Sequence, residues 1–243
     1  ISVFIETSDG EIKIDENEIY SSASTIKIPI LVEAMRQAEQ GNLNLDEKVS
    51  IDPSDIVGGG GILRLLSDNQ SVTIRDLMTL MIIVSDNSAT NMLIDRLGME
   101  PVNQTCREMG CEHTKLQRYM LQSVTPNDNL TSASDMVKIL KAINTGDIVS
   151  AESRDEILRI MGEQKLTGRL PAYRDSNEHR GVQIASKGGS LGSTEVKHDV
   201  AIFTHEDSTV YAAVLTQGLS QRTAQRSMAE IGESIMNHLV QTH

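Results

Sequence analysis

The sequence has few of the residues on which several kinds of protein depend. It contains no tryptophan and only two cysteines, Cys106 and Cys111, among its 243 residues. Those cysteines lie five residues apart across an expected helix end, a spacing that suits a disulfide poorly. We therefore expect two free, partly buried thiols. The six histidines are scattered without paired spacing, so the sequence predicts no metal site and no cofactor.

Positive charge is also scarce, since 22 lysines and arginines face 34 aspartates and glutamates. The net charge of −12 and the lack of a basic cluster argue against nucleic acid and anionic membrane surfaces as partners. No apolar run approaches the roughly 18 residues of a membrane span, and no signal peptide is visible. With 39% hydrophobic residues, the chain can form one large domain or two interleaved lobes.

Strand patterns lie at both ends of the chain and helix patterns fill the middle. Two alternating runs around Asp9-Gly10 predict a hairpin. Period-two runs predict three more strands at 182–185, 200–203 and 210–215. Helical spacing covers 24–40, 73–84, 88–97, 101–109, 133–143, 152–161 and 222–240.

This order of elements predicts an α+β fold. We expect a mostly antiparallel five-stranded sheet flanked by terminal helices, which would both cover one face of it, plus an inserted all-helical lobe. Residues 1–40 and 164–243 would form the sheet lobe, and residues 41–163 the helical lobe. A site between the two lobes is the natural place for chemistry.

Ser24 and Lys27 stand three residues apart at the start of a helical run. Residues at this spacing share a helix face, so the lysine amine can reach the serine hydroxyl. A serine becomes a good nucleophile only when a base takes its proton, and a lysine with a lowered pKa can be that base. Taken alone, the pair favours the simpler interpretation of a helix-cap serine and a solvated lysine.

Two further short motifs follow in the chain. Ser85-Asp86-Asn87 interrupts the helical segment, and Lys187-Gly188-Gly189 stands at the end of a predicted strand. Singly, Ser85 and Asn87 are compatible with helix caps, and Lys187 with a solvated strand end. Together, the motifs match the S-x-x-K, S-D-N and K-T-G signature in order and context, the third in altered form.

On these motifs the sequence resembles class A β-lactamases and penicillin-binding proteins over nearly its whole length. The similarity extends beyond the motif cores to 22–27, 84–91 and 231–233. The resemblance implies an acyl-enzyme mechanism on β-lactams or D-alanyl peptides. In it Ser24 attacks the carbonyl, Lys27 accepts or relays the proton, and Ser85 passes a proton toward the leaving nitrogen.

The resemblance also implies the substrate-binding residues. Asn87 would bind the substrate's amide, and Lys187 would supply positive charge near Ser85 and the substrate carboxylate. Gly189 and Ser190 would border the substrate, and the backbone N–H groups of Ser24 and Ser190 would form the oxyanion hole.

The sequence departs from the family at two important positions. Met120 stands where the class A enzymes carry the glutamate that activates the deacylating water. Gln122, Asn127 or Asp128 is an alternative for positioning that water.

Gly188 replaces a threonine or serine that binds the substrate carboxylate, a role that Ser190 or Ser193 could take. The family often brings a cation from the next strand, and Lys197 or His198 lies nearby without a clear match. The family's N-terminal helix has no counterpart.

We therefore expect a serine hydrolase that forms an acyl-enzyme with a β-lactam or a peptidoglycan stem peptide and deacylates slowly. A Met120→Glu change would then raise β-lactam turnover. The alternatives are a D-alanyl-D-alanine peptidase, a penicillin- or muropeptide-sensing domain that acylates without turnover, and a non-catalytic member that binds a partner. The expected protein is a monomer that acts outside the cytoplasm after removal of an export signal.

Overall fold

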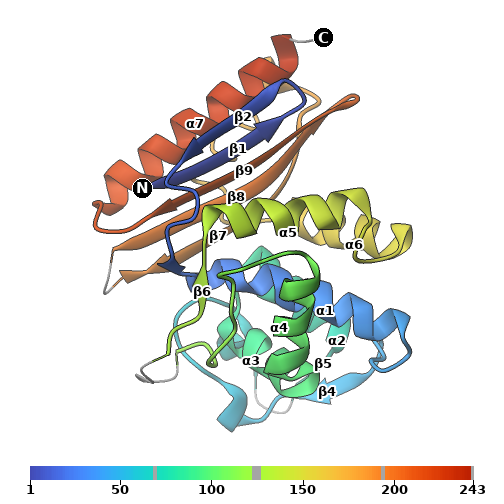
Figure 1. Cartoon of the computed structure of the whole chain (residues 1–243). Coiled ribbons are helices and arrows are strands. Elements are labelled where there is room, and N and C mark those ends of the chain that lie inside the picture. Colours follow the sequence, from blue (N-terminus) through green and yellow to red (C-terminus); the bar gives the residue numbers. More distant parts are fainter. Residues whose placement is uncertain (68–69, 122–126, 193–194, 242–243) are drawn as a thin grey trace.

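The computed structural model describes residues 1–67, 70–121, 127–192 and 195–241. Gln122 and Ser193, which were named above as candidates, lie outside these described residues. An antiparallel sheet of five strands in the order β2-β1-β9-β8-β7 lies between the C-terminal helix α7 (Gln221–Gln241) and the other helices (Figure 1). The predicted α+β fold and five-stranded sheet are thus confirmed.

The sheet joins the two ends of the chain. Strand β1 lies between the hairpin partner β2 and the late strand β9, so residues about 210 positions apart become neighbours, as in the pair Val3 and Val214. The first of the three late strands is longer than the sequence predicted, which places Lys187 within β7 rather than at its end. The sheet strands are β1 (Ser2–Thr7), β2 (Gly10–Ile14), β7 (Gln183–Leu191), β8 (Val196–His205) and β9 (Ser208–Thr216).

Two small ribbons lie outside the sheet, and the helices follow the predicted order. The ribbons pair β3 (Tyr20–Ser21) with β6 (Leu130–Thr131) and β4 (Lys48–Ser50) with β5 (Ser71–Thr73). None of the described helices is long and apolar enough to cross a membrane. The helices are α1 (Lys27–Glu39), α2 (Ile74–Ile83), α3 (Asn87–Leu97), α4 (Met99–Glu108), α5 (Ala133–Thr145), α6 (Ala151–Gly162) and α7 (Gln221–Gln241).

The two faces of the sheet bury different helices. Alternate residues of the sheet, such as Ala201 and Phe203, pack with Met228 and Met236 of α7 in one apolar cluster. The other face, which includes Val200, packs with the remaining helices in a second and larger cluster. The early helix α1 belongs to this second cluster, so the expectation that the early and late helices share one face is wrong.

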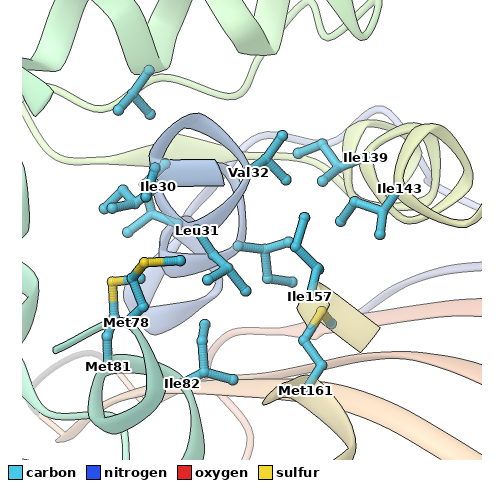
Figure 2. Packing of buried hydrophobic residues seen from close by; sticks show 14 of the residues in the cluster. Ile30, Leu31, Val32, Met78, Met81, Ile82, Ile139, Ile143, Ile157 and Met161 are labelled. Atoms are coloured by element: carbon cyan, nitrogen blue, oxygen red, sulfur yellow. The ribbon is translucent and has the colours of Figure 1, made fainter. Parts of the chain in front are cut away.

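Helix α1 is the centre of the larger core. Every residue from Lys27 to Met35 is buried, so the helix has no solvent face in this part. A helix buried on all sides is surrounded by other elements. Figure 2 shows Leu31 of α1 among Met78 and Ile82 of α2 and Ile157 of α6. This packing holds the N-terminal turn of α1, and therefore Ser24, in a fixed position.

Both cysteines lie in the helical part of the molecule. Cys106 and Cys111 are free thiols, and both are buried rather than partly buried. Burial raises the pKa of the Cys106 thiol to about 12, because the apolar surroundings disfavour the thiolate. Neither thiol is therefore set up as a nucleophile.

Candidate active site

Ser24 lies in a short 3-10 turn, Ala23–Ile26, that leads directly into α1. The preceding residue Ala23 has φ +47°, a left-handed conformation that costs free energy for a residue with a side chain. A Cβ added to Gly189 of β7 would lie 2.9 Å from Ser24 N and 3.0 Å from Ala23 Cβ. Only a glycine at this position lets the strand pass so close to the turn that carries Ser24.

Ser85 lies in a second strained turn, between α2 and α3, with φ +56°. Asp86 is the residue that caps α3, since its Oδ1 accepts from Ala89 N at 3.0 Å. Its Oδ2 accepts from Ile62 N at 2.7 Å and Leu63 N at 2.9 Å. Asp86 therefore has the structural role expected of it, and the cap interpretation of Ser85 and Asn87 is excluded.

The four-glycine loop, residues 58–61, presses directly against this turn. Asn87 N donates to Gly60 O at 3.1 Å, and Asn87 Nδ2 donates to Gly58 O at 3.2 Å. A Cβ on Gly60 would lie 2.9 Å from Ser85 O, and Gly61 has φ +116° against Asp86. Gly60 and Gly61 are thus required by close approach to this turn, and the loop holds Ser85 and Asn87 at the edge of a cleft.

Lys27 is fully buried and points at the Ser85 turn. Its Nζ donates to Ser85 O at 2.8 Å and to Asn87 Oδ1 at 2.8 Å, and it lies 3.1 Å from Ser85 Oγ. Burial, and then the nearby positive charge of Lys187, hold the pKa of Lys27 well below its usual range. No hydrogen bond joins Lys27 to Ser24 Oγ in the described part of the chain, so the amine lies closest to Ser85.

Lys187 approaches Ser85 from the opposite side. Its Nζ donates to Ser85 Oγ at 3.1 Å and to Gly188 O at 2.6 Å. Burial, and secondly the charge of Arg169, lower the pKa of Lys187 to about 7. The Ser85 hydroxyl is therefore within 3.1 Å of two lysine amines. Both amines are fully buried, in a protein whose net charge is strongly negative.

Arg169 is a functional candidate that the sequence did not reveal. Its Nη1 donates to His198 O at 2.7 Å and to Gly189 O at 3.2 Å, and its Nη2 donates to Ser190 Oγ. A Cβ on Gly188 would lie 2.5 Å from Arg169 Nη1. The guanidinium therefore lies where a threonine or serine side chain would begin. The only indication of this in the sequence is the glycine at position 188, which leaves space that another side chain can fill.

Lys197 and His198, the two candidates for a cation from the next strand, are not among the described residues that line the cleft. His198 is buried, and burial lowers its pKa to about 4, so its ring is neutral. His198 Nε2 lies 2.8 Å from Ser21 O, and Thr216 N donates to Nδ1 at 3.2 Å. The ring thus ties β8 and β9 to the segment that leads into Ser24, which is a structural role.

These residues surround one cleft of about 790 Å³. Of the sequence-predicted site residues, Ser24, Ser85, Asn87, Gly189 and Ser190 line it directly. The remaining two are Lys27 and Lys187, which are connected to the cleft by their hydrogen bonds to the Ser85 hydroxyl. The structure therefore brings all seven predicted residues together. The other described residues of the lining are Gly59, Gly60, Leu121, Lys165, Leu166, Thr167, Gly168, Arg169, Gly188, Leu191, Gly192 and Gln225.

The loop that resembles the glutamate-bearing segment presents Leu121, not Met120, to this cleft. Met120 is buried in the larger core, and Asn91 binds its backbone N and O at 2.8 and 3.2 Å. Leu121 is half exposed, has φ +59° and lines the cleft. Met120 therefore lies beside the cleft wall rather than in it. Asp128, one of the alternatives for holding water, forms an ion pair with Arg118 at 2.6 Å.

This arrangement fits nucleophilic acyl transfer. A serine that follows a left-handed residue stands at a helix start, a buried amine of lowered pKa lies next to a second serine, and cations line part of the cleft. The geometry defines a serine-dependent acyl-transfer site.

Comparison with known proteins agrees with this geometry. The model of the beta-lactamase enzyme family matches residues 1–239. The beta-lactamase of Sphaerobacter thermophilus has 27% identity and a TM-score of 0.91, with 98% of this chain and 90% of that chain covered. The L158E mutant of PBP-A, determined as an acyl-enzyme complex with penicillin G, has 28% identity, a TM-score of 0.86 and coverage of 98% and 89%.

A similar relative by sequence is beta-lactamase BRO-1 of Moraxella catarrhalis, which is 26% identical over 218 residues. These residues are 87% of this chain and 68% of the relative. The chain belongs to the beta-lactamase enzyme family, because the family model covers nearly all of it. It has the class A β-lactamase fold, and it is a β-lactamase-like serine hydrolase.

Proposed function

We propose that the protein acylates itself on Ser24 with a β-lactam or a D-alanyl peptide and releases the acyl group slowly. Ser24 Oγ forms a bond to the carbonyl carbon and the C–N bond of the substrate breaks, giving an ester. The proton of Ser24 passes to Lys27 and then, through Ser85 Oγ, to the leaving nitrogen. The observation that carries this proposal is the Ser85 hydroxyl between two buried lysines.

The binding roles follow from the same cleft. A substrate carboxylate would lie near the cations Lys187 and Arg169, and Asn87 would bind the acyl-side amide. Because Gly188 has no hydroxyl, Arg169 would supply the donor that it lacks. The Ser24 N–H, beside Gly189 at the edge of β7, would donate to the developing oxyanion, together with the N–H of Ser190.

Slow release of the acyl group is supported by the composition of the cleft. Among the described residues that line it there is no aspartate, glutamate or histidine. Hydrolysis of the ester needs a base that takes a proton from water, and general-base catalysis contributes about 10²–10⁴-fold. Leu121 occupies the loop position that faces the cleft, and its side chain cannot accept a proton. The acyl-enzyme should therefore persist.

The decisive experiment detects the covalent product. Incubation with a fluorescent penicillin should label the protein on a denaturing gel. Intact mass should increase by the mass of one penicillin, and peptide mapping should place the adduct on Ser24. The Ser24→Ala variant should remain unlabelled while keeping its melting temperature. An unlabelled wild-type protein, or a label that survives in Ser24→Ala, would contradict the proposal.

The lifetime of this adduct separates the related functions. Slow β-lactam hydrolysis requires the adduct to decay, and a D-alanyl-D-alanine peptidase would also release D-alanine from a stem-peptide analogue. A sensing domain would keep the adduct and release nothing. Stem peptides and most β-lactam targets lie outside the cytoplasm, so the proposal includes action there.

The two lysines also predict the pH dependence of acylation. The rate should rise with pH while Lys27, whose pKa is lowered, loses its proton. It should fall again as pH passes about 7, because Lys187 then loses the charge that attracts a carboxylate. Acylation rate constants for penicillin G across about pH 5–9 at constant ionic strength would check this.

Two controls test the assignment of the falling limb. The Lys187→Arg variant keeps its charge at every accessible pH, so the fall should disappear. A neutral activated ester without a carboxylate should show no fall with the wild-type protein. A fall that persists in both cases would exclude Lys187 as its origin.

A further inference from the structure

Leu121 has a large apolar side chain that the fold holds in the cleft at a cost in backbone conformational free energy. Its φ of +59° is a left-handed conformation that a branched residue rarely adopts. The neighbouring Met120 is anchored in the core, with its backbone N and O both bound by Asn91. Because residue 120 is fixed in this way, the left-handed turn directs residue 121 to the cleft. Such strain is retained most often at functional sites.

Gly59 on the opposite wall makes room for this leucine. A Cβ on Gly59 would lie 3.0 Å from Leu121 Cδ1 and 2.8 Å from Asn87 Nδ2. The leucine methyl group and the Asn87 amide therefore border the same corner of the cleft. Gly59 itself has φ +73°, so this position both favours glycine and leaves the corner open.

This corner lies next to the proposed amide-binding residue Asn87, whereas Arg169 lies against β7. Arg169 contacts Gly189 and Ser190 of β7. A substrate that directs its carboxylate to the cations and its amide to Asn87 places whatever follows the amide against Leu121. Because Leu121 is half exposed, covering it with an apolar group removes apolar surface from water and so favours binding.

We propose that Leu121 is the specificity-determining wall of an acyl-side subsite, which selects acyl donors with an apolar or aromatic group beyond the amide. This inference rests on the proposed function, because an acyl donor must first bind in the cleft. It assigns to Leu121 a role in choosing the substrate, separate from the chemistry on Ser24.

A pair of penicillins that differ by one group tests this subsite. Penicillin G carries a phenylacetyl group, and 6-acetamidopenicillanic acid has the same amide without the phenyl ring. The wild-type protein should be acylated faster by penicillin G. Leu121→Ala should lower the ratio of the two rate constants about fivefold, mainly by slowing penicillin G.

Two further variants make the test independent of folding. Leu121→Asn has a similar size, tolerates the left-handed backbone and removes the apolar surface, so it should lower the ratio as much as alanine. Leu65→Ala, which removes an exposed leucine outside the cleft lining, should leave the ratio unchanged. An unchanged ratio in both Leu121 variants would overturn the subsite. Absence of any adduct in the wild-type protein would instead refute the proposed function.

Discussion

Replacing Lys27 by methionine should slow acylation of Ser24 by about 10²–10⁴-fold, the usual contribution of a general base. The side chain is fully buried, so its ammonium form is strongly disfavoured and its pKa is lowered by burial and by Lys187. A neutral amine has two N–H donors and one lone pair. It can donate to Ser85 O and Asn87 Oδ1 and still accept a proton from a serine hydroxyl.

Methionine keeps the unbranched shape of lysine and removes only the amine. The variant loses a buried polar group, and two acceptors lose a donor, so its melting temperature must be measured beside its activity. Lys27→Arg separates charge from base catalysis, because a guanidinium keeps its proton at all accessible pH values. Both variants should be about equally slow when acylation by penicillin G is followed by intact mass. Acylation by either variant at the wild-type rate would show that another group accepts the proton.

The motifs predicted the catalytic core of the site because they describe local geometry. Ser24 and Lys27 come from one helix start, and Ser85 and Asn87 from one turn, so their spacing largely determines their arrangement. The remaining positions depended on the loops. Residues 164–181 show no periodicity, and nothing in the sequence indicates that Arg169 would bend back over β7 to fill the space beside Gly188.

The orientation of the loop after α4 was also hidden from the sequence. Alignment of Arg118 and Tyr119 with the family placed Met120 at the glutamate position. The structure buries that residue, because Asn91 binds its backbone and the core accepts its side chain. The left-handed backbone of Leu121 shifts the cleft-facing position by one residue. Residue propensities disfavour a positive φ at a leucine, so they could not have predicted this conformation.

The five strands of the sheet and the α-helices among the described residues were predicted because their periodicity is strong, although β7 and β8 extend well beyond the predicted runs. The position of α1 was the larger error. Its apolar run is continuous over residues 28–32, and Lys27 to Met35 are all buried. Such a run indicates a helix enclosed on every side, whereas a helix on an outer sheet face has a polar stripe, as α7 does with exposed Arg222, Arg226 and Glu230. The division into residues 1–40 with 164–243 and 41–163 stays a prediction.

A glutamate at position 121 should shorten the lifetime of the penicilloyl adduct by about 100-fold, within the range of general-base catalysis. The side chain would enter the cleft next to Asn87 and Gly59, where the described lining has no carboxylate. A carboxylate there can accept a proton from a water that attacks the ester on Ser24. The nearby lysines would keep it ionised at neutral pH. Among similar proteins, an acyl-enzyme with penicillin G is known for a leucine-to-glutamate variant of PBP-A.

The matched control is Met120→Glu, which the sequence alone had favoured as the activating change. Its carboxylate would be placed in the apolar core, so the variant should lose stability and gain no turnover. The measurement is the decay of the adduct by intact mass, together with steady-state hydrolysis of penicillin G. Faster decay in Leu121→Glu alone would assign the water-facing position to residue 121. Faster decay in Met120→Glu alone would show that residue 120, rather than residue 121, faces the cleft in the acyl-enzyme. Equal adduct lifetimes in both variants and the wild type would show that neither position of the loop supports deacylation. The pair of variants therefore tests whether the left-handed φ of Leu121, which turns this residue rather than Met120 to the cleft, sets the position from which a carboxylate can act on the acyl-enzyme.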